Sequence, residues 1–155
     1  MNKSTMKDAI ALLTHDHKQV KNAFKRYEAL GDHAYVAKKK LADEICADLS
    51  LHATVEEEIF YPAVRKAVKN SGDMMNEAEV EHASAKELIS QIMAMPAQDQ
   101  LFDAKVKVLS EQIDHHASEE EAEMFVSARE ANMDLIALGE EISARKAQLS
   151  GVPVT

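Results

Sequence analysis

A histidine followed four residues later by a glutamate occurs twice in this chain, and this repetition restricts what the chain can fold into. His52 precedes Glu56 in LHATVEEEIFYP, and His116 precedes Glu120 in HHASEEEAEMFV. On an α-helix, residues i and i+4 lie on one face, one turn apart. Each pair therefore directs an imidazole and a carboxylate at one point, which requires helices that face a shared interior.

Two further histidines precede these pairs at similar distances. His17 lies in LTHDHKQV, 35 residues before His52, and His82 lies in EVEHASAKEL, 34 residues before His116. The chain thus reads H, HxxxE, H, HxxxE. This order predicts two metal ions between four helices, with the two glutamates placed to bridge them.

Five helical segments are predicted, because apolar residues recur at three- and four-residue spacing and convincing strands are absent from the pattern. The segments cover about residues 5–30, 34–69, 73–95, 99–129 and 132–149. Ser4 or Thr5 can cap the first helix, Pro96 ends the third, and Pro62 should kink or interrupt the second. The inward-facing residues predicted for the second segment are Leu41, Ile45, Leu49, His52, Glu56 and Ile59.

Short connections between these segments favour an all-α fold, an antiparallel up-down four-helix bundle with a short extra C-terminal helix. We expect a single domain over residues 1–155, with the bundle core at about 5–129, the extra helix at 132–149 and a tail at 150–155. His17 and His82 are 65 residues apart, and the two HxxxE pairs are 64 residues apart. Two helix hairpins related by a pseudo-twofold axis through the metal centre would produce this repeat.

Composition narrows the class of partner and the compartment. The net charge of −9 makes nucleic acid an improbable partner, and no apolar run reaches the roughly 20 residues of a membrane span. The N-terminal residues lack the apolar stretch of a signal peptide. The lone Cys46 cannot form an internal disulfide, so we expect a buried thiol in a reducing, cytoplasmic setting.

The polar residues on the apolar stripes define the candidate site. Buried carboxylates need a partner or a metal, and imidazole with carboxylate suits iron or manganese. The predicted metal ligands are His17, His52, Glu56, His82, His116 and Glu120. We expect surface or supporting positions for His15 and His115 and a loop position for His33. A solvated acidic face, of which one residue could tune the site, is expected for Glu57, Glu58, Glu119, Glu121 and Glu123.

A ferritin-like di-iron site is the main alternative for such a bundle, and the spacing excludes it. That scheme uses two E-x-x-H pairs plus two further glutamates. This chain offers one such pair, Glu79 with His82, whereas Leu49 and Ile113 stand three residues before the other two histidines.

The motifs LLTHDHKQV, LSLHATVEEEIFYPAVRK, EVEHASAKEL and DHHASEEEAEMF resemble the hemerythrin-like, or HHE cation-binding, family from about residue 8 to 149. The resemblance implies a four-helix bundle with a non-haem di-iron centre. By position, His17 and His52 would bind one iron, and His82 and His116 the other. The two glutamates of the HxxxE pairs would bridge the irons.

The chain departs from the oxygen-carrying hemerythrins in two places. Those proteins have a fifth histidine where this chain has Lys86, and a five-residue His-to-Asp spacing where this chain has four residues from His116 to Glu120. The resemblance is closer to bacterial four-histidine proteins. Fewer protein ligands would leave coordination positions open to a small ligand, which favours chemistry over reversible oxygen carriage.

Three functions are consistent with these features. The first is a di-iron protein that binds, senses or reduces dioxygen, hydrogen peroxide or nitric oxide, with a weak reductase activity toward the last two. The second is a reversible oxygen carrier or an iron-binding module without turnover. The third is a regulatory protein whose metal centre sets an interaction surface.

Overall fold

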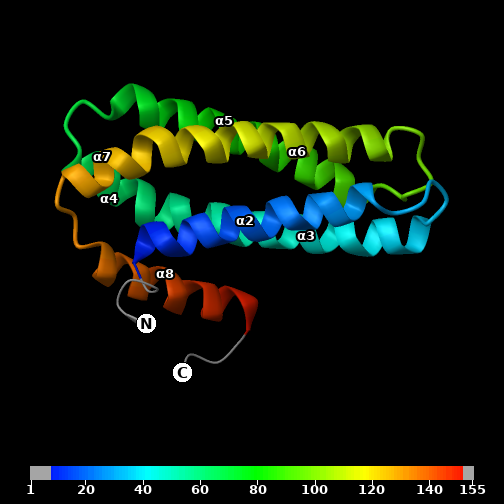
Figure 1. The fold of residues 1–155 in the computed structure, drawn as a ribbon, viewed down its shortest axis with the longest axis horizontal. Helices are drawn as coiled ribbons and strands as arrows, with labels where there is room; N and C mark the ends of the chain where they lie inside the picture. The colour runs from blue at the N-terminus through cyan, green and yellow to red at the C-terminus, as the bar shows by residue number, and fades with distance from the viewer. Residues whose placement is uncertain (1–7, 152–155) are drawn as a thin grey trace.

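The structure, a computed structural model, describes residues 8–151, and these residues form a bundle of helices (Figure 1). The elements are α2 Ala9–Glu28, α3 Tyr35–Val55, η1 Glu56–Phe60, α4 Tyr61–Ala67, α5 Gly72–Ala94, α6 Phe102–Glu119, η2 Glu120–Met124, α7 Phe125–Glu130 and α8 Leu135–Ser150. The η elements are single π-helical turns that join α3 to α4 and α6 to α7. The described part of the chain contains no strand.

The helices form two antiparallel hairpins that pack side by side. α2 packs on α3 and α5 packs on α6, while α3 also contacts α5 and α2 contacts α6. Figure 1 shows the up-down arrangement, with α8 lying along the α2–α3 side of the bundle. The predicted all-α bundle with an extra C-terminal helix is therefore confirmed.

Helix ends follow local sequence signals. Asp8 caps α2, because its carboxylate accepts hydrogen bonds from the amides of Ile10 at 2.8 Å and Ala11 at 3.2 Å. The cap predicted at Ser4 or Thr5 lies outside the described residues, and the described helix begins at Ala9 rather than near residue 5. α5 ends at Ala94, two residues before Pro96, as predicted.

The two π turns occupy equivalent positions in the repeat, 64 residues apart. In each, an amide donates to the carbonyl five residues earlier, from Tyr61 to Glu56 and from Phe125 to Glu120. The first turn interrupts the second predicted helix just before Pro62. No proline lies in or directly after the second π turn, so a proline such as Pro62 is not required to form a π turn at this position of the repeat. Both turns begin at a predicted bridging glutamate.

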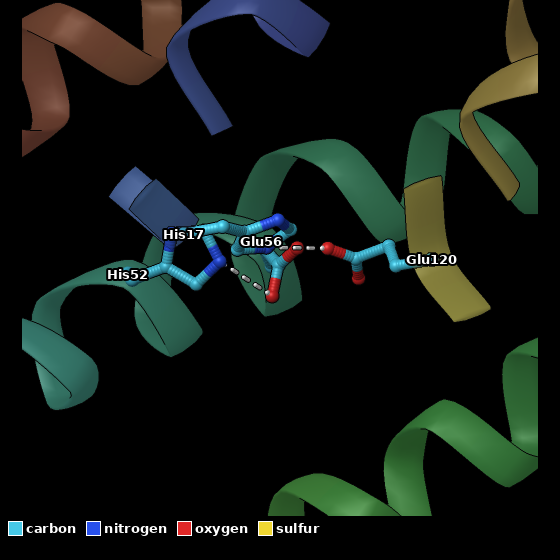
Figure 2. Close-up of side chains that lie close together, drawn as sticks. All are labelled: His17, His52, Glu56 and Glu120. Carbon is cyan, nitrogen blue, oxygen red and sulfur yellow. Dashed lines mark ion pairs between the residues drawn. The ribbon is translucent and has the colours of Figure 1, made fainter. Parts of the chain in front are cut away.

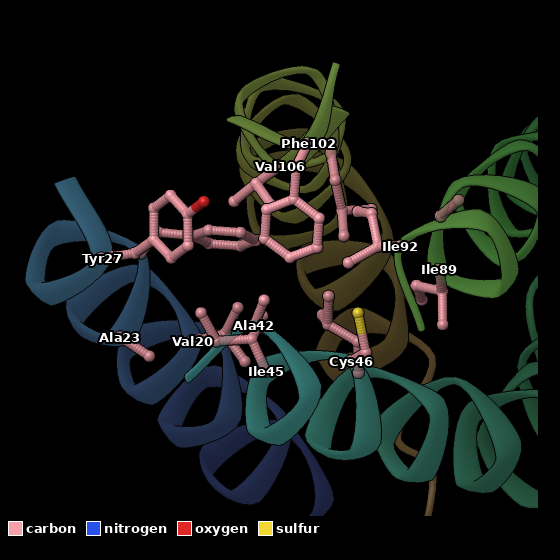
Figure 3. Close-up of a cluster of buried hydrophobic side chains, with 14 of the residues drawn as sticks. Val20, Ala23, Tyr27, Ala42, Ile45, Cys46, Ile89, Ile92, Phe102 and Val106 are labelled. Carbon is pink, nitrogen blue, oxygen red and sulfur yellow. The ribbon is translucent and has the colours of Figure 1, made fainter. Parts of the chain in front are cut away.

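Two apolar clusters fill the bundle, one on each side of a polar layer. The first is shown in Figure 3 and includes Val20, Phe24, Ile45, Leu49, Ile89, Phe102 and Leu109. The second includes Leu13, Val55, Phe60, Val64, Met75, Phe125 and Ile142. Along α2, Leu13 belongs to one cluster and Val20 to the other, so His17 lies between them. The clusters therefore enclose the layer that contains the predicted ligands.

Cys46 lies within the first cluster and is 1% exposed, as expected of a buried thiol. Burial, together with Asp43, raises the pKa of this thiol to about 11. Among the described residues, no helix is long and apolar enough to cross a membrane.

Candidate metal centre

The structure brings all six predicted ligand side chains into the polar layer. One histidine comes from each long helix, and each π turn contributes its first glutamate. The six side chains are His17, His52, Glu56, His82, His116 and Glu120, each at most 11% exposed. Figure 2 shows four of them, with the carboxylates of Glu56 and Glu120 directed at each other and at the histidines.

Each glutamate contacts one histidine from each hairpin. Oε1 of Glu56 lies 3.2 Å from Nε2 of both His52 and His82. The Oε1 of Glu120 lies 3.1 Å from Nε2 of His17, and its Oε2 lies 3.3 Å from Nε2 of His116. Both carboxylates therefore join the two halves of the layer, as bridging ligands of two cations would.

The donor atoms form two groups in which every ligand atom lies within 4.8 Å of the others. One group is His17, His52, Glu56 and Glu120, and the second is Glu56, His82 and His116. The imidazole rings pair accordingly, with centroids 5.0 Å apart for His17 and His52 and 4.9 Å apart for His82 and His116. Two adjacent groups of donor atoms, each of a kind that could hold a cation, therefore share Glu56.

Four buried atoms of this layer make no hydrogen bond within the described residues: His17 Nε2, His52 Nε2, Glu56 Oε2 and Glu120 Oε1. A buried polar atom without a partner costs about 1 to 3 kcal/mol. Nitrogen and carboxylate oxygen atoms that converge without hydrogen bonds are the donor set of a first-row transition metal. The residues present therefore fit a bound metal cation.

A second layer of carboxylates orients the four imidazoles from outside. Each Nδ1 faces one carboxylate oxygen, at 2.7 Å for His17–Glu121, 2.8 Å for His52–Asp16, 2.7 Å for His82–Glu57 and 2.6 Å for His116–Glu81. An Nδ1–H that donates outward leaves the Nε2 lone pair directed at the centre. This is the usual arrangement of metal-binding histidines.

Two residues of the predicted acidic face, Glu57 and Glu121, therefore contact the central histidines, where the sequence had suggested that one acidic residue could tune the site. Each follows a predicted bridging glutamate and contacts the histidine of α5 or α2. Their shared 64-residue spacing was the signal that could have identified them. Of the other acidic residues, Glu58 and Glu123 are exposed and Glu119 is half-buried.

In the metal-free protein, the clustered carboxylates favour protonated histidines. Burial opposes the charge on His52, but Glu56 and Asp16 raise its pKa to about 10. Burial likewise opposes the charge on His116, and Glu120 with Glu56 raises its pKa to about 9. Although burial alone would raise the pKa of Glu56, His52 and His82 hold that pKa well below its usual value.

Tyr61 is a central residue that the sequence analysis missed. Its hydroxyl lies 3.1 Å from Nε2 of both His82 and His116, 3.2 Å from Oε1 of Glu56, and also contacts Glu120. On a regular α-helix, Glu56 and Tyr61 would diverge, but the π turn places residues i and i+5 on one face. Burial and the two carboxylates raise the pKa of Tyr61 far above its usual value, so the phenol keeps its proton.

Lys86 does not point into the centre. Its Nζ donates to Glu57 Oε1 at 2.6 Å, and its side chain is half exposed. The Tyr61 hydroxyl lies beside His82 and His116, 3.1 Å from Nε2 of each. The Lys86 position therefore acts on the site through Glu57.

The remaining histidines lie where the sequence predicted them. His15 and His33 are exposed. His115 is also exposed, 3.4 Å from Glu119 and 3.9 Å from Glu81. These three do not face the central layer.

A cavity of about 290 Å³ adjoins the centre. All four central histidines line it, together with apolar residues that include Leu49, Ala53, Ala85, Ile89 and Ile113. Its rim includes the exposed residues Ser50, Ser84 and His115. A small, weakly polar molecule could therefore approach the histidines from this side.

The fold and the histidine–glutamate centre define a helical-bundle protein with a cation-binding site. The chain belongs to the hemerythrin HHE cation-binding domain family, whose sequence profile matches residues 8–127. The assignment agrees with the predicted resemblance.

Similar proteins come from mycobacteria and a cyanobacterium. Uncharacterized proteins of Mycobacterium tuberculosis and Mycobacterium bovis are 25% identical over 117 residues, which cover 74% of this chain and 70% of theirs. A DNA nickase of Nostoc sp. is 30% identical over 114 residues, which cover 74% of this chain and 31% of that protein. The crystal structure of a hemerythrin HHE cation binding domain-containing protein from Mycobacterium kansasii has the same fold, with a TM-score of 0.77, 24% identity and coverage of 93% of this chain and 88% of that one.

Proposed function

We propose that this chain is a non-haem di-iron protein that binds and reduces a small oxidant: dioxygen, hydrogen peroxide or nitric oxide. The observation that carries the proposal is the layer of four imidazoles and two shared carboxylates, in which four buried atoms lack hydrogen bonds. Nitrogen and carboxylate ligands in this number suit iron, and family membership supports cation binding.

In this proposal, His17 and His52 would hold one iron, His82 and His116 would hold the other, and Glu56 and Glu120 would be shared between them. Bound iron would supply electrons and exchangeable coordination positions for the oxidant. The four outer carboxylates hold the imidazole rings in place through Nδ1.

Tyr61 supplies the proton-bearing group closest to the His82–His116 position. Its hydroxyl lies within 3.2 Å of Glu56 Oε1 and of Nε2 of both histidines, and it is screened from solvent. A phenol in this place can donate a hydrogen bond or a proton to an oxidant that lies between these two histidines. The cavity that adjoins the histidines has a largely apolar wall, which suits small gases or peroxide.

Oxygen carriage or iron storage without turnover is the alternative. The proton-bearing Tyr61 favours reduction over carriage, because a bound oxidant beside a proton donor is easily reduced further. The lone thiol of Cys46 favours a reducing compartment, and we place the protein in the cytoplasm, where electron donors are available.

Spectra of the anaerobically reduced, iron-loaded protein after mixing with air-saturated buffer test the proposal. We expect rapid irreversible oxidation, together with consumption of added hydrogen peroxide or nitric oxide. An absorption band that persists for many minutes in air and disappears under vacuum would establish carriage instead. Protein that takes up no iron would contradict both functions.

A further inference from the structure

The carboxylate of Asp16 connects the metal centre to α8. Its Oδ2 accepts a hydrogen bond from His52 Nδ1 at 2.8 Å and another from Nζ of Lys146. Lys146 belongs to α8, which lies outside the four-helix bundle (Figure 1). Both side chains of this ion pair are largely buried, so it is better shielded from solvent than an ordinary surface pair.

The two halves of α8 are held in different ways. The N-terminal half buries Leu135, Gly139 and Ile142 against the bundle. Beyond Ile142, no residue of α8 is fully buried, and charged side chains hold the helix to the bundle. Arg145 donates to both carboxylate oxygens of Glu58, at 2.8 and 3.3 Å, next to the Lys146–Asp16 contact. The C-terminal half is therefore anchored to neighbours of the metal centre.

The equivalent carboxylate of the second hairpin is supported differently. Glu81 accepts from His116 Nδ1 at 2.6 Å, and its other oxygen lies 3.9 Å from the exposed His115. α8 packs instead on α2, α3 and η1, which carry His17, His52 and Glu56. A contact made by α8 therefore acts on the His17–His52 half.

We propose that Lys146 is a positioning residue for the metal position between His17 and His52, and that metal binding there is coupled to docking of the C-terminal half of α8. Lys146 fixes Asp16, and Asp16 fixes the ring orientation and tautomer of His52. Coupling between two sites is reciprocal. Metal that orders His52 therefore tightens α8, and loss of the α8 contact weakens metal binding.

Hydrogen exchange of the full chain, with and without Fe²⁺ under anaerobic conditions, tests this coupling. The inference rests on the proposed metal binding. Because the experiment uses no oxidant, its result does not depend on the proposed reduction chemistry. We expect the amides of residues 143–150 to exchange at least roughly threefold more slowly with Fe²⁺, because the opening of this segment then opposes metal binding. The same effect should be seen in Lys146→Arg, which keeps the charge.

Lys146→Met should abolish this protection. It should also lower the affinity for one of the two Fe²⁺ ions about threefold to tenfold, which is less than the 10- to 100-fold loss typical of groups that contact a metal-binding side chain directly. Lys39→Met is the matched control. Lys39 is 30% exposed, against 26% for Lys146, and its Nζ donates to the carbonyls of Ile92 and Met93 at the far end of α5. It should retain wild-type protection and affinity.

The outcomes separate this inference from the proposed function. Fe²⁺ uptake without protection of α8 in the wild type, or equal weakening by Lys146→Met and Lys39→Met, would overturn the coupling alone. A chain that binds no Fe²⁺ would overturn the coupling and the di-iron proposal together.

Discussion

The two halves of the metal centre come from equivalent helix hairpins, yet different rings lie beside their histidines. Phe125 stacks on His17, with ring centroids 5.9 Å apart and planes at 2°. Its equivalent, Tyr61, lies against His82, with centroids 5.1 Å apart and planes at 44°. The Tyr61 hydroxyl is therefore one difference between two positions that the repeat makes similar.

The central histidine nitrogens that make no hydrogen bond lie only in the half without the hydroxyl. His17 Nε2 and His52 Nε2 contact carboxylate oxygens but make no hydrogen bond, whereas Nε2 of both His82 and His116 lies 3.1 Å from the Tyr61 hydroxyl. The repeat thus duplicates the candidate ligands. A single side-chain difference places a hydroxyl beside one pair of histidines and an apolar ring beside the other. We expect the two positions to differ in reactivity for this reason.

Loss of a predicted ligand should have the largest effect. His116→Ala removes Nε2 from the second position, together with the histidine contacts of Glu81 and Glu120, so metal content should fall from two ions per chain to one or none. His115→Ala is the control, because the adjacent ring is exposed. Metal analysis after anaerobic loading measures both, and equal losses would mean that the ligand assignment is wrong.

Tyr61→Phe should remove the hydroxyl that distinguishes the His82–His116 half from the His17–His52 half. Because a positioned proton donor contributes roughly 100-fold or more to such a reaction, reduction of hydrogen peroxide should slow by about that factor while metal content is kept. Tyr27→Phe is the matched control, since the buried Tyr27 donates to Asp103 at 2.6 Å, within the apolar cluster of Figure 3. If Tyr61→Phe reduced peroxide at the wild-type rate, the Tyr61 hydroxyl would cause no functional difference between the halves.

The metal-free protein should lose stability at alkaline pH, because both halves then rely on protonated histidines. The pKa of His52 is raised to about 10 and that of His116 to about 9, from an unfolded value of about 6.5. A raised pKa contributes stability that is complete below about pH 6.5 and is lost as the pH rises through 9 to 10.

Thermal melts at several pH values check this dependence. Each kcal/mol lost should lower Tm by about 3 °C for a domain of this size. The metal-loaded protein should depend less on pH over the same range, since its imidazoles stay neutral as ligands. A metal-free protein that is as stable at pH 10 as at pH 6.5 would contradict the role of His52 and His116.

Lys86→His should have the smallest effect. From the sequence, a histidine here could fill an open position, but the Tyr61 hydroxyl already lies beside His82 and His116. The substitution mainly removes the half-exposed Lys86–Glu57 pair, and such pairs contribute about 0 to 1 kcal/mol. Oxidation rates in air should stay within about twofold of wild type, and a long-lived oxygenated spectrum would show that residue 86 does reach the metal.

The sequence predicted the helices and the stripes because a period of 3.6 residues fixes which side chains face inward. His17, Val20 and Phe24 follow that period along α2, as do His82, Ala85 and Ile89 along α5. The bundle and the meeting of the six candidate ligands were therefore predictable. Their roles as metal ligands stay a prediction.

The period of 3.6 residues no longer applies at the π turns, because one extra residue in the turn changes which side chains face inward. Phe60 is fully buried, whereas the predicted Ile59 is only half-buried. The same shift brings Tyr61 onto the face of Glu56. A hydrogen-bonding pattern that differs from the regular helix leaves no periodic signal, so Tyr61 was missed.

Mössbauer spectroscopy of ⁵⁷Fe-loaded protein, with iron quantified per chain, tests most directly whether the two halves hold two different irons. The account predicts two irons per chain in two distinct environments of equal population, which become similar in Tyr61→Phe. A single iron per chain, or two irons in identical environments in the wild type, would contradict it.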